Sequence, residues 1–97
     1  MPKGYWVANL EVTDVEAYKA YQIFVRAFVA DNGGRFLIRG GLQTVVEGQV
    51  KPRTVVIEFP SYEHALRVYR SGEYQQGMQL RMNASSANFT VVEGFDS

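Results

Sequence analysis

The order of the hydrophobic patterns along the chain limits its fold more than any other sequence feature. Residues 5–12 alternate apolar and polar side chains with the period of a β-strand. The remaining segments are a helical pattern over residues 13–31, a strand from Arg35, a strand over 54–59, a helical region over 61–82 and a strand over 88–94. This β-α-β-β-α-β order predicts an α+β, ferredoxin-like fold, a four-stranded antiparallel sheet with two helices on one face.

Polar residues and glycines mark the ends of the two helical regions. Thr13 and Glu16 have the spacing of a capping box, which predicts that the first helix starts at Thr13. Asn32-Gly33-Gly34 is typical of a helix C-terminus, because Asn and Gly tolerate the left-handed backbone. Ser61 predicts the start of the second helical region, and we expect Ser71 to kink or restart that region.

Two helices can cover only one face of a four-stranded sheet, so the other face meets water or a partner. One alternating set of strand residues is nearly all apolar and is expected to face the helices: Trp6, Ala8, Leu10, Val12, Phe36, Ile38, Val55, Ile57, Phe59, Phe89 and Val91. The opposite set is about half apolar: Tyr5, Val7, Asn9, Glu11, Leu37, Arg39, Thr54, Val56, Glu58, Thr90 and Val92. Since a large exposed apolar patch usually marks an interface, we predict a two-fold homodimer packed through the sheet face. A monomer with a mixed open face is the alternative.

The second strand carries an internal glycine pair. We place this strand over residues 35–48 and expect a bulge or sharp bend at Gly40-Gly41, followed by a loop over residues 48–53. The assignment of its side chains to the two sheet faces depends on where that irregularity falls.

Composition bounds the class of protein. With 97 residues and 46% hydrophobic residues, we expect one ferredoxin-like domain over residues 1–97, with its core over 4–94. Ten basic and ten acidic residues balance, which argues against nucleic acid or an anionic membrane as partner. No apolar run is long enough to span a membrane, and we expect a cytoplasmic protein. Zero cysteines and one histidine exclude a zinc site of His and Cys, and nothing in the sequence suggests a metal or cofactor.

The chain resembles the domain-of-unknown-function family 1330 from Gly4 to Gly94. The motifs that carry the resemblance are GYWVANLEVTDVEAY, GGRFLIRGG, PRTVVIEFPSYEHA, YRSGEYQ, the pair Leu80-Arg81 and the closing VVEG. The resemblance implies a dimeric α+β barrel, in which two sheets pack face to face, and it implies no activity. The wider dimeric-barrel class includes cofactor-free monooxygenases, lactone isomerases, dehalogenating and haem-degrading enzymes and small-ligand sensors.

Two charged residues lie in otherwise apolar or glycine-rich strand segments. Glu58 interrupts the run Val55 to Phe59, so its carboxylate is either a general base or one half of an ion pair at a sheet rim or dimer seam. Arg39 precedes Gly40-Gly41, on the face that we assign to Glu58. Its guanidinium could clamp the carboxylate of a ligand that approaches the glycine backbone, or it could pair with Glu58 or with an acidic residue of a partner chain.

Further candidates lie on the second helical region and at the start of the third strand. His64 is the only histidine, and it is a candidate catalytic base or haem ligand, with an exposed helix position as the alternative. Arg53 and Arg81 could bring positive charge to a pocket or could be solvated at the surface. Tyr69 and Tyr74 would line a pocket wall or belong to the core.

These residues support three functional hypotheses. The first is a homodimer with a small pocket for a small organic acid or aromatic carbonyl compound, in which Arg39 and Arg81 hold the anion and Glu58 accepts a proton. Its chemistry would be cofactor-independent proton transfer, isomerisation or a monooxygenase-like reaction. The alternatives are a non-catalytic ligand-binding or stress-related module and, third, a haem-binding protein that uses His64.

Overall fold

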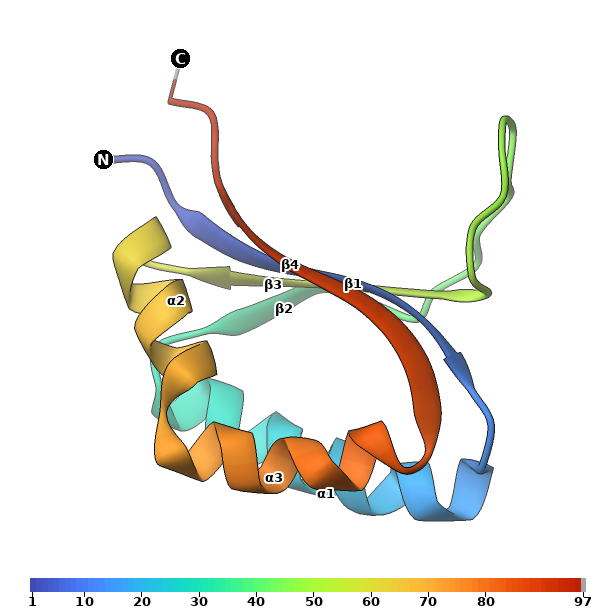
Figure 1. Ribbon diagram of the computed structural model, residues 1–97. Coiled ribbons are helices and arrows are strands. Elements are labelled where there is room, and N and C mark those ends of the chain that lie inside the picture. The colour runs from blue at the N-terminus through green and yellow to red at the C-terminus, as the bar shows by residue number, and fades with distance from the viewer. Residues whose placement is uncertain (97) are drawn as a thin grey trace.

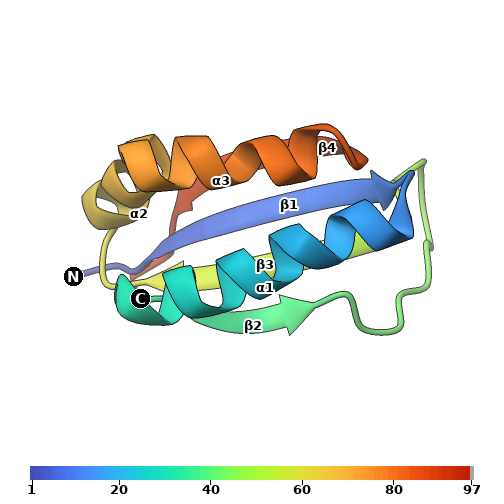
Figure 2. The same ribbon diagram turned by 90° about the horizontal axis from the view of Figure 1, so that it is seen from below.

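A computed structural model describes residues 1–96 as one antiparallel sheet with helices on one of its faces (Figures 1 and 2). The elements are β1 (Gly4–Val12), α1 (Val15–Asp31), β2 (Arg35–Arg39), β3 (Arg53–Phe59), α2 (Tyr62–Arg70), α3 (Gly72–Met82) and β4 (Ser85–Glu93). The strand order is β2-β3-β1-β4, and every neighbouring pair is antiparallel. This arrangement confirms the α+β, ferredoxin-like prediction. Of the helices in residues 1–96, none is long and apolar enough to cross a membrane.

Serine and aspartate side chains set the starts of the helices. Ser61 accepts a hydrogen bond from the His64 amide at 3.1 Å and starts α2. Ser71 ends α2 and starts α3, so the second helical region is two helices, as the restart predicted. The predicted start at Thr13 is wrong. The N-cap of α1 is Asp14, whose side chain accepts a hydrogen bond from the Ala17 amide at 3.0 Å.

The second strand differs most from its prediction. The pairing of β2 with β3 shifts register between Phe36 and Ile38, so Leu37 is the extra residue of a bulge. The predicted bulge at Gly40-Gly41 and the extension of the strand to residue 48 are therefore wrong. The strand ends at Arg39, and residues 40–52 form a loop that projects from the sheet on the side opposite the helices (Figure 1).

The bulge exchanges the faces of the two residues that follow it. Ile38 lies opposite Val56 on the open face and is 47% exposed, although its position in the alternation predicted a core residue. Arg39 lies opposite Val55 and faces the helices, although we predicted it on the open face. Three consecutive apolar residues, Phe36 to Ile38, leave no alternation in the sequence from which the shift could be read.

Trp6 of β1 is the centre of the core. Its side chain is 1% exposed, and its indole nitrogen donates to the Ala65 carbonyl of α2 at 2.8 Å. Its ring centroid lies 4.8 Å from that of Tyr74 and 4.9 Å from that of Phe59. The buried residues that share this core are Ala8, Leu10, Tyr18, Tyr21, Val25, Phe28, Val29, Ile57, Phe59, Ala65, Val68, Tyr74, Met78 and Ala84. The predicted inward face of β1 is thus confirmed as core up to Leu10.

Candidate functional site

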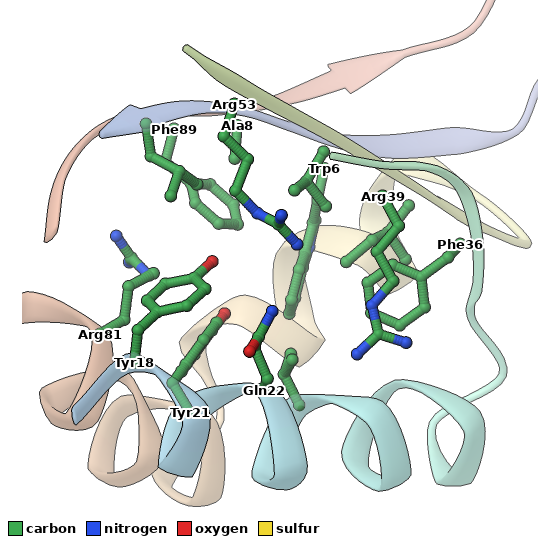
Figure 3. Close-up of a pocket in the computed structure, with 14 residues that line it drawn as sticks. Trp6, Ala8, Tyr18, Tyr21, Gln22, Phe36, Arg39, Arg53, Arg81 and Phe89 are labelled. Atoms are coloured by element: carbon green, nitrogen blue, oxygen red, sulfur yellow. The ribbon is translucent and has the colours of Figure 1, made fainter. Parts of the chain in front are cut away.

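A cavity lies between α1, α3 and the helix-facing side of the sheet (Figure 3). It is narrow, with about 30 Å³ of room for the centres of water molecules, enough for roughly two or three waters. Its lining is mostly aromatic and aliphatic, with three arginines and one glutamine: Trp6, Ala8, Leu10, Tyr18, Tyr21, Gln22, Val25, Phe36, Arg39, Arg53, Val55, Ile57, Arg81 and Phe89. An aromatic cavity with a few convergent polar groups is the usual form of a small-molecule site.

Arg81 is the buried charge of this cavity. It lies in the last turn of α3, and its side chain is 4% exposed. Its guanidinium carbon lies 5.2 Å from the ring centroid of Phe89 and 5.8 Å from that of Tyr21, and its Nε has no hydrogen-bond partner within residues 1–96. The ion pairs formed by the described residues do not include Arg81. Since a buried cation is normally paired with an anion, this end of the cavity favours a negatively charged group.

A pair of tyrosines provides hydrogen-bond donors beside Arg81. The hydroxyls of Tyr21 in α1 and Tyr74 in α3 are 2.8 Å apart. Burial raises the pKa of Tyr21 far above its ordinary value, and the neighbouring Tyr74 hydroxyl raises it further. Burial also raises the pKa of Tyr74. Both hydroxyls therefore stay protonated, and after one donates to the other, one hydroxyl hydrogen remains for a further acceptor.

Arg53 and Arg39 approach the cavity from the strand ends near the base of the loop. Arg53 begins β3, its guanidinium carbon lies 5.8 Å from the Tyr18 ring centroid, and its buried Nε has no partner among residues 1–96. A Cβ atom at Gly40 would overlap this guanidinium, so the glycine makes room for the protein's own arginine. Arg39 is exposed and stacks over the Phe36 ring at 4.6 Å.

The cavity continues outward into a cationic depression, which we call the mouth. The mouth is lined by Lys19, Gln22, Ile23 and Arg26 of α1 with Arg39 and Arg53 of the sheet. Gln22, Arg39 and Arg53 line both the mouth and the cavity. Lys19 is bonded to Glu16 at 3.1 Å, so the net positive charge of the mouth comes from its three arginines. Clustered charge of one sign at an opening raises the local concentration of anions.

The structure brings some of the predicted site residues together. Arg39 and Arg81 both line the cavity, and Tyr74 lies behind its wall through its bond to Tyr21. Tyr69 packs its ring 5.2 Å from that of Tyr74 and donates to the Met78 sulfur at 3.4 Å, so it supports the wall from the core.

Glu58 lies on the opposite face of the sheet. Its carboxylate accepts from the Arg35 Nε at 3.0 Å and from the Tyr5 hydroxyl at 3.4 Å. The predicted partner Arg39 is therefore wrong, because the bulge turns Arg39 away and places Arg35 opposite Glu58. Glu58 thus forms an ion pair with a different arginine from the one predicted, and its role as a general base stays a prediction.

His64 joins the start of α2 to the end of α1. Its Nε2 lies 2.6 Å from the Asn32 carbonyl oxygen, so this nitrogen carries the hydrogen and donates it. The cavity lining does not include His64. With one ring nitrogen engaged at a helix C-cap, His64 has a structural position, and its roles as a base or haem ligand stay predictions.

Three residues of the cavity lining, Tyr18, Tyr21 and Gln22, were not among the site residues predicted from the sequence. Tyr18 and Tyr21 belong to the apolar stripe of α1. Their hydroxyls are the one feature of that stripe from which a polar cavity wall could have been predicted. Gln22 follows them directly, and its amide points into the space between the helix and the sheet (Figure 3). At the edge of an apolar stripe, the sequence looks the same whether a polar side chain points into a cavity or into solvent.

Comparisons with known proteins fit this fold. A protein of unknown function from Rhodopseudomonas palustris superimposes with a TM-score of 0.75 at 14% identity, over 99% of this chain and 85% of that one. SnoaB, a cofactor-independent oxygenase from Streptomyces nogalater, gives 0.61 at 12% identity, over 100% and 97%. A dimeric ferredoxin-like protein of unknown function from Thermobifida fusca gives 0.60 at 7% identity, over 94% and 92%.

These likenesses show the fold and no activity. No curated protein matches the chain in sequence. The sequence profile of the family described as a domain of unknown function, DUF1330, matches residues 3–95. The chain therefore belongs to the DUF1330 family.

Proposed function

We propose that this protein binds a small organic anion with a flat apolar body in the cavity between α1 and the sheet. The observation that carries the proposal is Arg81, a buried guanidinium without a carboxylate partner among the described residues, at the inner end of an aromatic cavity. An anion at this end would neutralise a charge that the fold leaves uncompensated. The rings of Trp6, Phe36 and Phe89 supply flat apolar surface for the rest of the ligand.

The cationic mouth gives such a ligand its route. The enclosed space is too narrow for a substituted benzene ring unless side chains move. Gln22 and Arg39 are the residues expected to move, because both are shared between the cavity and the mouth and Arg39 is exposed. The arginines of the mouth would attract the ligand, and Arg81 would hold it. Glu58 has no part in this proposal, since it lies on the other face of the sheet.

Matched pairs of acids and amides test the proposal. We expect benzoate and its ring-substituted analogues to raise the melting temperature, and the corresponding benzamides to leave it unchanged, because only the acids carry charge to Arg81. At 100 times its Kd, a ligand adds about 2.7 kcal/mol to the free energy of unfolding, a shift on the order of 10 °C for a domain of this size. The measurement is thermal unfolding followed by calorimetric titration of the compounds that shift it.

Arg35→Gln is the matched control for this experiment. It removes an arginine from the open face and should bind the acids as the wild type does. Equal shifts from acids and amides would contradict the charge argument. Absence of any shift across the panel at millimolar concentrations would contradict the proposed binding site.

We also propose that two copies pair through the open face of the sheet. Leu37, Ile38 and Val92 are between 44% and 47% exposed there or at its bulge, and the loop 40–52 projects beside this face (Figure 1). Leu42 and Val46 of that loop are also exposed. Exposed apolar area of this kind favours an interface over a solvated face. A protein of the same fold from Thermobifida fusca is described as dimeric, which supports the proposal.

Light scattering tests the pairing. We expect a mass of about twice 11.0 kDa at micromolar concentration, and we expect Ile38→Lys to halve it, because a buried unpaired charge at an interface is costly. Ile23→Lys is the control, since Ile23 is 76% exposed on the helical side and should leave the mass unchanged. A wild-type mass of 11 kDa, or dimers that persist in Ile38→Lys, would contradict pairing through this face.

A further inference from the structure

We infer that the ligand of the cavity is a dianion, with one anionic group at each end of its flat body. This inference rests on the proposed function and names the charge of its ligand class. The proposed function needs only one anionic group, which lies at Arg81. The second group follows from the cations at the other end of the same cavity.

The cavity and its mouth hold half of the positive charges of the chain. The chain has ten basic and ten acidic residues, so its net charge is zero. Five of the ten basic residues line the cavity or the mouth: Lys19, Arg26, Arg39, Arg53 and Arg81. Among the described residues that line either space, none is an aspartate or a glutamate. A chain that is neutral as a whole therefore surrounds this one space with positive charge only, which favours a ligand with more than one negative charge.

Arg53 has the same unmatched guanidinium at the mouth that Arg81 has at the inner end. In each, a buried Nε lacks a hydrogen-bond partner among residues 1–96, and no ion pair within this range includes either side chain. The backbone makes room for the Arg53 guanidinium at Gly40, where a Cβ atom would overlap it. Since a cation withdrawn from water is normally paired with an anion, each of the two guanidinium groups favours an anionic partner.

The two guanidinium groups stand on neighbouring rings. The guanidinium carbon of Arg53 lies 5.8 Å from the ring centroid of Tyr18, and that of Arg81 lies 5.8 Å from the ring centroid of Tyr21. The centroids of these two rings are 5.7 Å apart, and Figure 3 shows the Tyr18 ring between the two arginines. This arrangement favours two separated anionic groups over one group that both arginines share. Because both arginines line the same cavity, a flat body along its aromatic wall can reach from one to the other.

The outer end of a bound aromatic ligand meets the mouth. The enclosed space is narrow, so a ligand whose inner end is at Arg81 extends outward past the residues that the cavity and the mouth share. There it meets Arg39 and Arg26 as well as Arg53. An uncharged outer end would leave these cations unmatched, whereas an anionic end complements them. Charge-assisted hydrogen bonds to a guanidinium are also stronger than those to a neutral donor.

Dicarboxylates and their monoamides test the second anionic group. Terephthalate and 4-carbamoylbenzoate share a ring and one carboxylate and differ only in the other group. The pair 4-(carboxymethyl)benzoate and 4-(carbamoylmethyl)benzoate is one methylene longer. We expect the dianion of at least one pair to bind at least tenfold more tightly than its monoamide in calorimetric titration at pH 7. Phthalate has the same charge with both groups on one side of the ring, and we expect it to gain less than twofold over phthalamate.

Arg53→Gln tests which cation holds the second group. It removes the charge and keeps a polar side chain, so the dianion should bind only as tightly as its monoamide, while the affinity for benzoate changes by less than about threefold. Arg35→Gln is the matched control, because it removes an arginine from the open face and should keep the full difference between dianion and monoamide. Thermal melts without ligand check that both variants fold, and the wild-type comparison decides the inference if Arg53→Gln does not.

The outcomes separate this inference from the function on which it rests. If benzoate binds and neither dianion binds more tightly than its monoamide, the dianion is overturned and the proposed function still stands. If phthalate gains as much as the longer dianions, or if the gain persists in Arg53→Gln, the placement of the two groups at opposite ends is wrong. If neither benzoate nor any dianion binds, the proposed function itself fails.

Discussion

Arg81→Met is expected to melt at a higher temperature than the wild type and to bind none of the acids that the wild type binds. The wild-type side chain is a cation that is 4% exposed, with a buried Nε that lacks a partner within residues 1–96. Replacing even a buried ion pair with apolar groups of similar volume is often neutral or stabilising by about 1–4 kcal/mol, and a gain of that size is on the order of 5 °C or more for a domain of this size. Methionine has a similar length and adapts to irregular space.

Thermal melts with and without benzoate measure both effects in one experiment. The combination is informative, because a residue kept for stability would lower the melting temperature when removed. Arg35→Met serves as the control, since Arg35 is exposed and paired with Glu58. It should change the free energy of unfolding by no more than about 1 kcal/mol and leave benzoate binding intact. An Arg81→Met protein that is markedly less stable than the wild type would instead identify the guanidinium as part of the structural core.

Trp6→Ala is expected to cost about 3–5 kcal/mol of the free energy of unfolding. The ring is 1% exposed, and the rings of Phe59, Tyr69, Tyr74 and Phe89 surround it with centroids between 4.8 and 5.9 Å away. The substitution also leaves the Ala65 carbonyl without its donor. Domains of this kind are stable by about 5–15 kcal/mol, so the loss would remove a large part of the total.

Urea unfolding followed by far-ultraviolet circular dichroism tests this, because the variant lacks the tryptophan needed for fluorescence. The midpoint should fall sharply with little change in slope. Trp6→Phe keeps an aromatic ring, so its urea midpoint should lie between those of the wild type and Trp6→Ala. A loss below about 1 kcal/mol for Trp6→Ala would mean that another residue, and not Trp6, holds α2 and α3 against the sheet.

The parts of the fold that were predictable from the sequence are those with local signals. Strand alternation in residues 5–12 and the helical stripe of α1 depend only on spacing within one element. The serines at 61 and 71 act within three residues of themselves, and both caps are as predicted. Each of these features is determined by residues that are close together in the chain, so it can be predicted from a single sequence.

The parts that were not predictable depend on contacts between distant segments. The helix α1 starts at Asp14 and not at Thr13, and the amides of both residues are bonded to the carbonyl of Ala84, about seventy residues away in sequence. In the site, Arg81 was a candidate for its charge, but its burial depends on how α3 packs against α1 and β4. The register shift in β2 is set by pairing with β3, and it separated Arg39 from Glu58.

The bulge at Leu37 makes the register of β2 against β3, and not only the residue types of β2, a determinant of the cavity. One extra residue decides whether Arg39 or Ile38 faces the mouth. Loss of Leu37 would remove the bulge and leave Ile38 opposite Val56 and Arg39 opposite Val55, whereas regular pairing of the full strand would place Ile38 opposite Val55 in place of the arginine. The residue identities of β2 alone therefore do not reveal which of its side chains reaches the entrance, because the register against β3 decides it.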